Sequence, residues 1–476
     1  MSKRLFILLH RQLAWVAGFA LICWSVSGIL HPVMSWFGPQ PVAMFPPSMT
    51  LAPNTLTDMA TAVRGSGVDS ARVVKLVPSD AGALLQVTKS DAAPRQYFSL
   101  IDAAALPGQD EQQARWLAGH YSGRPVSDIE SVRFVSAFSE EYPEVNRLLP
   151  VYRVQFAGDD QLTAFIYTET GALASLNNTS KARLQQVFQQ LHTWAWLDAL
   201  GLGRVLLIAL FMVTLLLMAI GGLILLGLLP ARSIGDKHRR WHRRLGYVLW
   251  LPLLAWSASG FYHLIQAQYV EPVSGVRLGT ALDLVDLPAP TAALPQQQLT
   301  AVSLVSDGAG NLLYRLALAP EDESVSRQAR FNGRAASAGA VYLDATGNPV
   351  AHSDARQAAN LLAGFFDDRP AGEPSKVTRF GPDYDFRNKR LPVWQFELAD
   401  RAATRVFVDP ATGVLVDQSR RLDRAERWSF SLLHKWNFLT GLAGREGRDA
   451  LMVLVLASLL CSAIFGLKMG FRRRPN

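Results

Sequence analysis

Cysteine is scarce in this sequence, and so are the short motifs of common soluble enzymes. Only Cys23 and Cys461 occur among 476 residues, and both lie in long apolar stretches. The polar regions between those stretches contain no cysteine, so no disulfide bond supports them. The sequence has no HExxH, CxxC, GxSxG or Walker A motif, and no GxGxxG between a strand and a helix. Without a nucleotide-binding segment, the chain is not expected to take hydride from a nicotinamide itself.

Charged residues are also scarce, at 18% of the chain, whereas hydrophobic residues reach 49% and the mean hydropathy is +0.12. These values are high for a soluble protein of this length. The excess lies in four apolar segments, each long enough to cross a bilayer as a helix. The first is too long for a cleaved signal peptide, so we expect a retained helix. The segments cover residues 12–36, 203–229, 244–267 and 448–470.

The net charge of +8 comes mostly from bases beside these segments. Basic flanks stay in the cytoplasm, so we expect both termini and the 230–244 connection there, in a multi-pass protein of the bacterial inner membrane. Because topology explains the bases, we predict a membrane-lipid environment and no nucleic-acid partner. The bases are Lys3, Arg4, Arg11, Arg232, Lys237, Arg239, Arg240, Arg243, Arg244, Arg472, Arg473 and Arg474.

Two apolar stretches are copies of each other. Residues 9–31 and 241–263 each carry one histidine near each end, and the two histidines are 21 residues apart in both copies. At about 1.5 Å per residue this spacing spans roughly 31 Å, the hydrocarbon thickness of a bilayer. At about 100° per residue the two histidines fall within roughly 60° of the same helix face. Each helix should therefore present one imidazole near each membrane surface.

The duplication continues through the polar regions at offsets of 242 to 245 residues. The chain is therefore a repeat of helix, outer domain and helix, with two parallel halves related by an axis along the membrane normal. Alternating residues predict strands over 151–156 and 163–167, and a helical stretch over about 180–197. The matches include Leu117-Ala118-Gly119 with Leu362-Ala363-Gly364, Arg124-Pro125 with Arg369-Pro370, Tyr142 with Tyr384, Asn146 with Asn388, and His192 with His434.

Six of the nine histidines form three duplicated pairs, which are His10 with His242, His31 with His263, and His192 with His434. Two neutral imidazoles on facing helices are the usual ligands of a b-type haem. We therefore predict two b-type haems, with the first of these pairs holding the one near the inner surface. For the outer haem, pairing of the membrane helices favours the second pair, and the third pair is the alternative. A histidine at a membrane boundary can also simply hydrate its ring among headgroups. The unduplicated His120, His238 and His352 are not expected to be ligands.

Side chains near the histidines fit this hypothesis, although ordinary helix packing and topology explain them too. Small residues recur one turn from the outer histidine and would leave room for a flat macrocycle. The basic cluster could pair with the inner propionates. The tryptophans near the outer surface are expected mainly to form an aromatic belt. These groups are Ser25, Ser27 and Gly28 with Ser257, Ser259 and Gly260; Arg239, Arg240, Arg243 and Arg244; and Trp36, Trp194, Trp196, Trp428 and Trp436.

The repeated unit resembles the PepSY-associated transmembrane helix family. The likeness is carried by Leu9-His10-Arg11, by His242-Arg243-Arg244-Leu245-Gly246, and by the segments 191–204 and 433–448. The turns Glu169-Thr170-Gly171 and Asp409-Pro410-Ala411-Thr412-Gly413 resemble the closing part of PepSY domains. Some members of that family are inner-membrane ferrisiderophore reductases with two b-type haems.

The resemblance implies a membrane α-helical fold of four duplicated transmembrane helices with two α+β PepSY-like periplasmic domains. We expect the first span in 1–36, the first PepSY-like domain in 37–200 and the second span in 201–230. We then expect a basic cytoplasmic loop in 231–241 and the third span in 242–267. The second PepSY-like domain should follow in 268–446, and the last span with the cytoplasmic tail in 447–476.

Two functions are compatible with the sequence. The first is a dihaem electron carrier that reduces the ferric iron of a siderophore at the periplasmic face and releases it. A quinol or a separate cytoplasmic reductase would supply the electrons. The second is a haem-free binding or regulatory module, in which the outer domains act on a partner. The siderophore comes from the resemblance, whereas the haems are predicted from histidine spacing and duplication.

Overall fold

A computed structural model describes residues 3–229, 236–270, 275–285, 287–288, 290, 298–320, 339–366 and 372–471. The chain forms two compact units. The helical unit contains residues 1–38, 180–271 and 422–476, and the β-rich unit contains residues 39–179 and 272–421. Several predicted features lie outside the described residues, namely Arg232, Arg369-Pro370, Arg472, Arg473, Arg474 and residues 231–235 of the basic loop.

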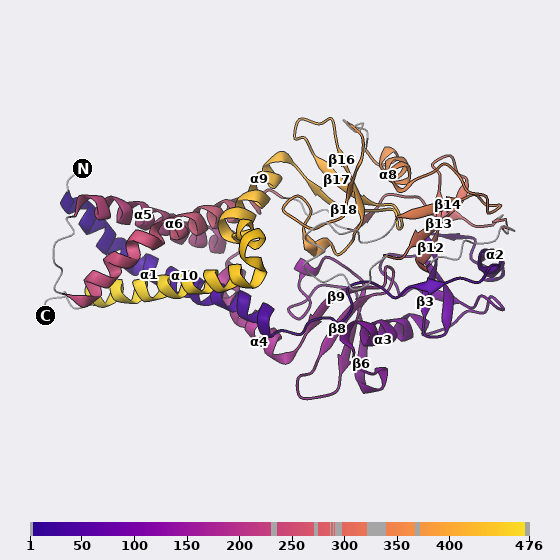
Figure 1. Ribbon diagram of the computed structural model, residues 1–476, viewed down its shortest axis with the longest axis horizontal. Helices are drawn as coiled ribbons and strands as arrows, with labels where there is room; N and C mark the ends of the chain where they lie inside the picture. Colours follow the sequence, from indigo (N-terminus) through magenta and orange to yellow (C-terminus); the bar gives the residue numbers. More distant parts are fainter. Residues whose placement is uncertain are drawn as a thin grey trace. The chain divides into compact units, whose positions relative to one another are not determined.

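Four helices of the helical unit are long and apolar enough to cross a membrane, which confirms the predicted number of spans. Helix α1 packs against α5 and α10, and α6 packs against the same two helices (Figure 1). At Gly444 α10 has a left-handed backbone (φ 67°), so its first turn bends away from the spanning part. The four helices are α1 (Lys3–Phe37), α5 (Leu202–Leu228), α6 (Lys237–Gln266) and α10 (Thr440–Phe471).

Matching short segments precede α5 and α10. Each begins with an α-helix, continues as one π-helical turn and ends in a 3₁₀ turn. Trp194 and Trp436 follow the π turns with left-handed backbone, at φ 52° and 51°. The first segment comprises α4 (Thr179–Phe188), η3 (Gln189–Thr193) and η4 (Ala195–Leu200). The second comprises α9 (Arg421–Ser429), η6 (Phe430–His434) and η7 (Asn437–Leu439).

The β-rich unit repeats one α+β arrangement, which confirms the predicted fold class. In the first half, α3 (Gln109–Ser122) packs on a four-stranded antiparallel sheet, and in the second half α8 (Asp354–Ala363) packs on the corresponding sheet. The first sheet contains β6 (Ile129–Val135), β7 (Val151–Phe156), β8 (Thr163–Tyr167) and β9 (Ala172–Asn177). The second contains β10 (Val276–Arg277), β15 (Ser375–Val377), β16 (Val393–Glu397), β17 (Arg405–Asp409) and β18 (Val414–Ser419). Strands β7 and β8 have the predicted bounds.

Both halves also contribute to one larger sheet, because β3 of the first half pairs antiparallel with β12 of the second, with Lys75 opposite Ser303. Helix α2 (Thr55–Gly65) packs on this sheet through an apolar face that includes Leu56 and Met59. The strands are β1 (Met49–Thr50), β3 (Val73–Ser79), β4 (Gly82–Thr88), β5 (Gln96–Phe98), β12 (Gln298–Ser306), β13 (Leu312–Leu318) and β14 (Ala340–Leu343). A separate pair joins β2 (Ser70–Ala71) to β11 (Leu282–Asp283).

Candidate functional site

The helical unit brings His10 of α1 and His242 of α6 face to face. Their ring centroids are 6.3 Å apart and the ring planes are inclined by 64°. A glycine of each remaining long helix lies beside the two rings. A Cβ atom on Gly222 would lie 3.8 Å from His10 Cε1, and one on Gly466 would lie 3.4 Å from His242 Cε1. All four long helices therefore meet at this pair.

The two imidazoles of this inner pair differ in their hydrogen bonds. His242 Nδ1–H donates to the carbonyl oxygen of Ser462 at 3.0 Å, so its lone pair lies on Nε2. His10 Nδ1 is buried and has no hydrogen-bond partner among the described residues. A buried polar atom without a partner is unusual and calls for an explanation. A ligand bound at His10 supplies one.

The second pair of facing imidazoles is formed by His192 and His434, which lie in the two π-helical turns. Their ring centroids are also 6.3 Å apart, and the planes are inclined by 85°. Each turn opens the backbone by one residue and so projects its histidine inward. Single π turns of this kind are frequent at functional sites. The sequence left the outer ligands open, and the structure brings together this pair.

Serines of the spans hold the outer imidazoles. Ser27 Oγ lies 3.0 Å from His192 Nδ1, and Ser259 Oγ lies 3.3 Å from His434 Nδ1. Both serine hydroxyls donate to backbone carbonyls of their own helices, so each serine oxygen is left to accept from the imidazole. Nδ1 is then the protonated nitrogen and Nε2 carries the lone pair. A second hydrogen bond of this type fixes the tautomer of a metal-ligating histidine.

Tryptophans fix the backbone of both π turns. Trp24 Nε1 donates to the carbonyl oxygen of His192 at 3.0 Å, and Trp256 Nε1 donates to that of His434 at 2.8 Å. Trp24 stacks on Trp194, with ring centroids 5.5 Å apart, and Trp256 stacks on Trp436 at 4.8 Å. These stacked pairs occupy equivalent positions in the two halves. They hold Trp194 and Trp436, whose backbones are left-handed.

Burial keeps the outer imidazoles neutral. Desolvation, together with the nearby His31 and His263, lowers the pKa of His192 to about 4. Desolvation, together with His192 and His263, lowers the pKa of His434 to about 3. Both rings are therefore neutral at physiological pH, which is the form that binds metals.

The duplicated pair His31 and His263 is exposed and lies outside the facing rings. His31 packs against Phe188 with ring centroids 6.1 Å apart, and Phe188 stacks on His192 at 4.6 Å. His263 stacks on Phe430 at 4.4 Å, and Phe430 stacks on His434 at 4.5 Å. A phenylalanine therefore separates each exposed histidine from the facing pair. His263 Nδ1 also bonds the carboxylate of Glu426 at 2.6 Å.

Both facing pairs fit a metal that is already held in a macrocycle. Two metal–imidazole bonds of about 2 Å each, added to the half-widths of two imidazole rings, give a centroid separation of roughly 6 Å. Across the described residues, no three His, Cys, Asp or Glu side chains converge as ligands of a bare metal ion. A haem iron needs only two axial ligands from the protein. The separation of 6.3 Å, the orphaned His10 Nδ1 and the adjacent glycines suit such a group.

The other singled-out residues have different surroundings. Nε2 of His120 lies 2.9 Å from the carbonyl oxygen of Phe45, and Nε2 of His352 lies 3.0 Å from Gln357 Oε1. His238 packs on Phe465 with ring centroids 5.7 Å apart.

Arg243 of the basic cluster donates to the carbonyl oxygen of Leu229 at 2.5 Å, so it binds the backbone at the end of α5. Of the five tryptophans expected in a belt, Trp194 is buried and Trp436 is half-buried. Trp36, Trp196 and Trp428 are exposed.

Sequence reasoning singled out Ser27 and Ser259, but it missed the other aromatic residues that pack around the outer imidazoles. Phe188 and Phe430 precede their histidines by four residues, and Trp24 and Trp256 lie in the duplicated stretch. Their recurrence in both halves was the available signal. Ser462 lies in α10, and no pattern in the sequence indicated its contact with His242.

Comparison with known proteins agrees with this architecture. The sequence matches the family described as PepSY-associated TM region over residues 8–340. A search of curated proteins gives no significant match. The matched range covers the first three long helices and most of the β-rich unit.

Proposed function

The chain belongs to the PepSY-associated TM region family, and on that premise we propose that it is a dihaem electron-transfer protein that reduces ferric chelates. One b-type haem would be held by His10 and His242. The other would be held by His192 and His434 rather than by His31 and His263. When bound, haem supplies a one-electron carrier whose potential is tuned by its axial ligands.

The observation that supports this proposal is that two pairs of facing histidines, with the same ring separation, lie at two heights along the helices of one unit. Both pairs have ring centroids 6.3 Å apart. His10 and Ser27 are 17 residues apart on α1, which at about 1.5 Å per residue separates the two levels by roughly 26 Å. Two carriers at that separation would connect the two faces of a bilayer.

The chain's own residues prepare these positions. Ser27, Ser259 and the backbone of Ser462 each bond an Nδ1 atom, which orients the ring and raises the basicity of Nε2. Apolar residues of the four helices keep water away from the ligands. Ring orientation and a dry environment are the means by which a protein sets the affinity and potential of a haem.

The expected substrate is ferric iron held by a siderophore at the outer face. One electron converts Fe(III) into Fe(II), and Fe(II) binds the hard oxygen ligands of a siderophore more weakly. Release of iron then follows without breaking a covalent bond of the chelator. The electron donor on the inner side would be a quinol or a separate reductase.

The orientation is part of the proposal. Lys3, Arg4 and Arg11 flank the first span, and Lys237, Arg239 and Arg240 lie at the start of α6. The positive-inside rule puts these ends in the cytoplasm. We therefore assign the protein to the bacterial inner membrane with both termini inside and the β-rich unit in the periplasm.

The visible spectrum of the purified protein tests the proposal. We expect a Soret band that shifts on reduction, with sharp α and β bands, and two haem equivalents per chain. Replacing His10 or His242 with Ala should remove about one equivalent. A folded, colourless preparation would refute the proposal and leave the haem-free module as the function.

Substrate reduction is tested separately. Pre-reduced protein mixed with a ferrisiderophore should be reoxidised with a stoichiometry of one Fe(II) per haem, and a ferrous chelator such as ferrozine reports the product. Gallium(III) in the same siderophore is the control, because it cannot accept the electron. A haem-containing protein that does not reduce the ferric complex would be an electron relay to another partner.

A further inference from the structure

A duplicated fold shows which of its charged groups it can do without, because the apolar counterpart of a charged side chain folds in the other half. One such difference lines a small pocket of the β-rich unit, and another lies at the outer end of α6 in the helical unit. The two places differ in whether their charged groups are already occupied by the protein itself.

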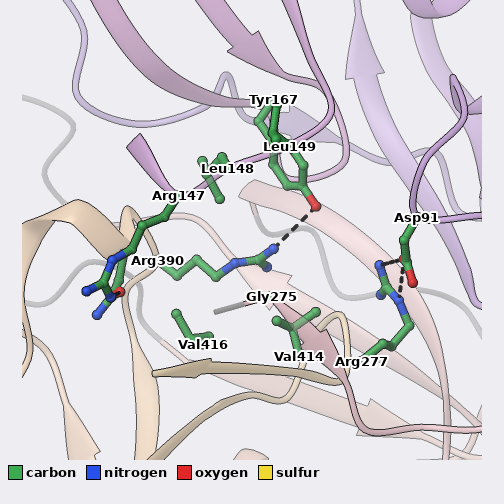
Figure 2. Close-up of a pocket in the computed structure, with 11 residues that line it drawn as sticks. Asp91, Arg147, Leu148, Leu149, Tyr167, Gly275, Arg277, Arg390, Val414 and Val416 are labelled. Carbon is green, nitrogen blue, oxygen red and sulfur yellow. Dashed lines mark hydrogen bonds and ion pairs between the residues drawn. The ribbon is translucent and has the colours of Figure 1, made fainter. Parts of the chain in front are cut away.

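The pocket lies where equivalent loops of the two halves meet, and its volume of about 40 Å³ has room for little more than water (Figure 2). Tyr142 donates its hydroxyl hydrogen to the carbonyl oxygen of Leu148 at 2.7 Å. Tyr384 makes the same bond to the carbonyl oxygen of Arg390 at 2.9 Å. Leu148 and Arg390 are therefore equivalent.

The charged half of the pocket wall satisfies its own charges. In the same register Tyr167 at the end of β8 corresponds to Asp409 at the end of β17. Leu148 and Tyr167 belong to one apolar cluster of the first half. In the second half Arg390 Nη1 bonds Asp409 Oδ2 at 2.6 Å and Thr412 Oγ1 at 2.9 Å, and the ion pair is almost fully buried. This guanidinium group is therefore committed to the protein.

The outer end of α6 shows a similar change beside an exposed side chain. His263 of α6 and Glu426 of α9 are joined by a bond of 2.6 Å between Nδ1 and Oε1. The spacing of 242 residues that relates the two π turns makes Leu184 of α4 the counterpart of Glu426. The second half therefore has a carboxylate where the first half has an apolar side chain.

Helix α9 buries acids rather than apolar side chains. Its two buried residues are Asp423 and Glu426, which are three positions apart and so share one face of the helix. Asp423 Oδ1 accepts a hydrogen bond from Gln266 Nε2 at 2.8 Å. Because an apolar face would dock the helix without the desolvation of two carboxylates, packing alone does not explain these residues.

The bond between His263 and Glu426 prepares the imidazole to exchange a proton. The side chain of His263 is 48% exposed, whereas that of Glu426 is 11% exposed. Nδ1–H donates to the carboxylate, so Nε2 is the ring nitrogen left to exchange a proton with another molecule. A carboxylate bonded to Nδ1 fixes the ring and stabilises the imidazolium. Histidine is also the side chain best suited to proton exchange near neutral pH.

The ring of His263 is the second one outward from His434. Phe430 lies between them, stacked on His434 at 4.5 Å and on His263 at 4.4 Å. In the first half the last contact is longer and tilted, because His31 lies 6.1 Å from Phe188 at an angle of 56°. The charged and titratable groups around His263 are Glu426, Asp423, His192, His434 and Lys435.

We propose that His263 donates the proton that accompanies reduction of the ferric chelate, and that Glu426 positions its ring. This inference rests on the proposed function. One electron converts Fe(III) into Fe(II), the bond between iron and an anionic chelator oxygen breaks, and the proton on Nε2 of His263 passes to that oxygen. Water then returns a proton to the imidazole. The protonated oxygen no longer competes for the iron, so release is favoured.

Two electron acceptors separate proton transfer from electron transfer. The pre-reduced protein is mixed in a stopped-flow instrument with ferric desferrioxamine B, a hydroxamate chelate, or with ferricyanide, which takes an electron without losing a ligand. His263→Ala should slow reoxidation of the haems by the hydroxamate chelate by about tenfold or more, because a general acid is lost. Glu426→Gln should slow it severalfold. Both variants should react with ferricyanide at the rate of the wild type.

Imidazole added at constant pH gives a readout that a purely structural role would not change. It should restore the reaction of His263→Ala with the hydroxamate chelate in proportion to its concentration, and it should not accelerate the wild type. His31→Ala is the matched control, because Leu184 stands where a carboxylate would be needed. It should react with both acceptors at the rate of the wild type.

The possible outcomes distinguish this inference from the proposed function. Equal rates with the hydroxamate chelate in the wild type, His263→Ala and Glu426→Gln would overturn the inference and leave the function intact. An equal loss of rate with ferricyanide, or no rescue by imidazole, would make the pair structural and would also overturn it. A wild type that reduces ferricyanide but not the ferric chelate would overturn both. If His263→Ala does not fold, Glu426→Gln decides by the same comparison of acceptors, since it keeps the shape of the side chain.

Discussion

The two halves of the chain surround their outer imidazoles with the same side chains but line the pocket of the β-rich unit with different ones. Around His192 and His434 the serine contacts differ by only 0.3 Å, at 3.0 and 3.3 Å. At the pocket, Leu148 of one half is replaced by Arg390 of the other. The helical unit is therefore close to two-fold symmetric around His192 and His434, and the pocket is not.

This contrast has a chemical reason. A metal in a planar macrocycle takes one axial ligand from each side, so two equivalent histidines suit it. Duplication alone provides such a site. The wall of the pocket, in contrast, differs between the two halves at positions 390 and 409.

The largest expected effect comes from removing one member of a facing pair. His434→Ala should lose about one of two haem equivalents, because His192 alone leaves the iron with a single axial ligand. His263→Ala should retain both equivalents, because Phe430 separates His263 from the pair. Haem content is measured by the pyridine haemochromogen assay. If His263→Ala loses a haem equivalent and His434→Ala retains both, then His263 and not His434 is the outer ligand.

A smaller effect is expected when the ion pair of the second half is broken. Arg390→Leu leaves the carboxylate of Asp409 buried without its partner, and removing one member of a buried pair costs about 3–5 kcal/mol of unfolding free energy. The further change Asp409→Tyr should recover most of that loss. Chemical denaturation followed by near-ultraviolet circular dichroism compares the three proteins. If the double variant is no more stable than Arg390→Leu, the two halves are not interchangeable at this position.

Much of this architecture could be predicted from the sequence, because its signals are local or periodic. Hydropathy marks four spans, alternation marks β7 and β8 with their bounds, and fixed spacing marks the paired histidines. Which of the outer histidines face each other could not be predicted, because this depends on the π turns that contain His192 and His434. The pocket could not be predicted either, since residues of both halves line it only when the two halves fold together.

The smallest expected effect concerns two equivalent aspartates of the β-rich unit, Asp110 and Asp354, whose contributions to stability should depend differently on pH. Tyr97 donates to Asp110 at 3.1 Å, and Tyr342 donates to Asp354 at 2.6 Å. Burial raises the pKa of Asp110, and Arg95 only partly opposes it. Burial would also raise the pKa of Asp354, but Arg315 bonds both of its oxygens, at 2.7 and 2.9 Å, and lowers it below the ordinary value.

Because the two pKa values shift in opposite directions, the two aspartates should change the stability of the fold with pH in opposite directions. An unfolded aspartate titrates near about 3.9. Asp354 therefore stabilises the fold above that pH, and its contribution disappears as the pH falls through its lower folded pKa. Asp110 binds its proton more tightly in the folded state, so its contribution falls as the pH rises from about 3.9 through its higher folded pKa.

The melting temperatures of Asp354→Asn and Asp110→Asn, measured at several pH values, test these two directions. The loss of melting temperature in Asp354→Asn should be greatest at pH 7 and should shrink toward pH 3, because the unfolded wild-type chain binds a proton at Asp354 there whereas the folded state resists it. The melting temperature of the wild type should instead rise relative to that of Asp110→Asn as the pH falls from 7 to 4. If both variants show the same trend, then Arg315 does not distinguish the two halves electrostatically, and the equivalent carboxylates share one environment despite their different partners.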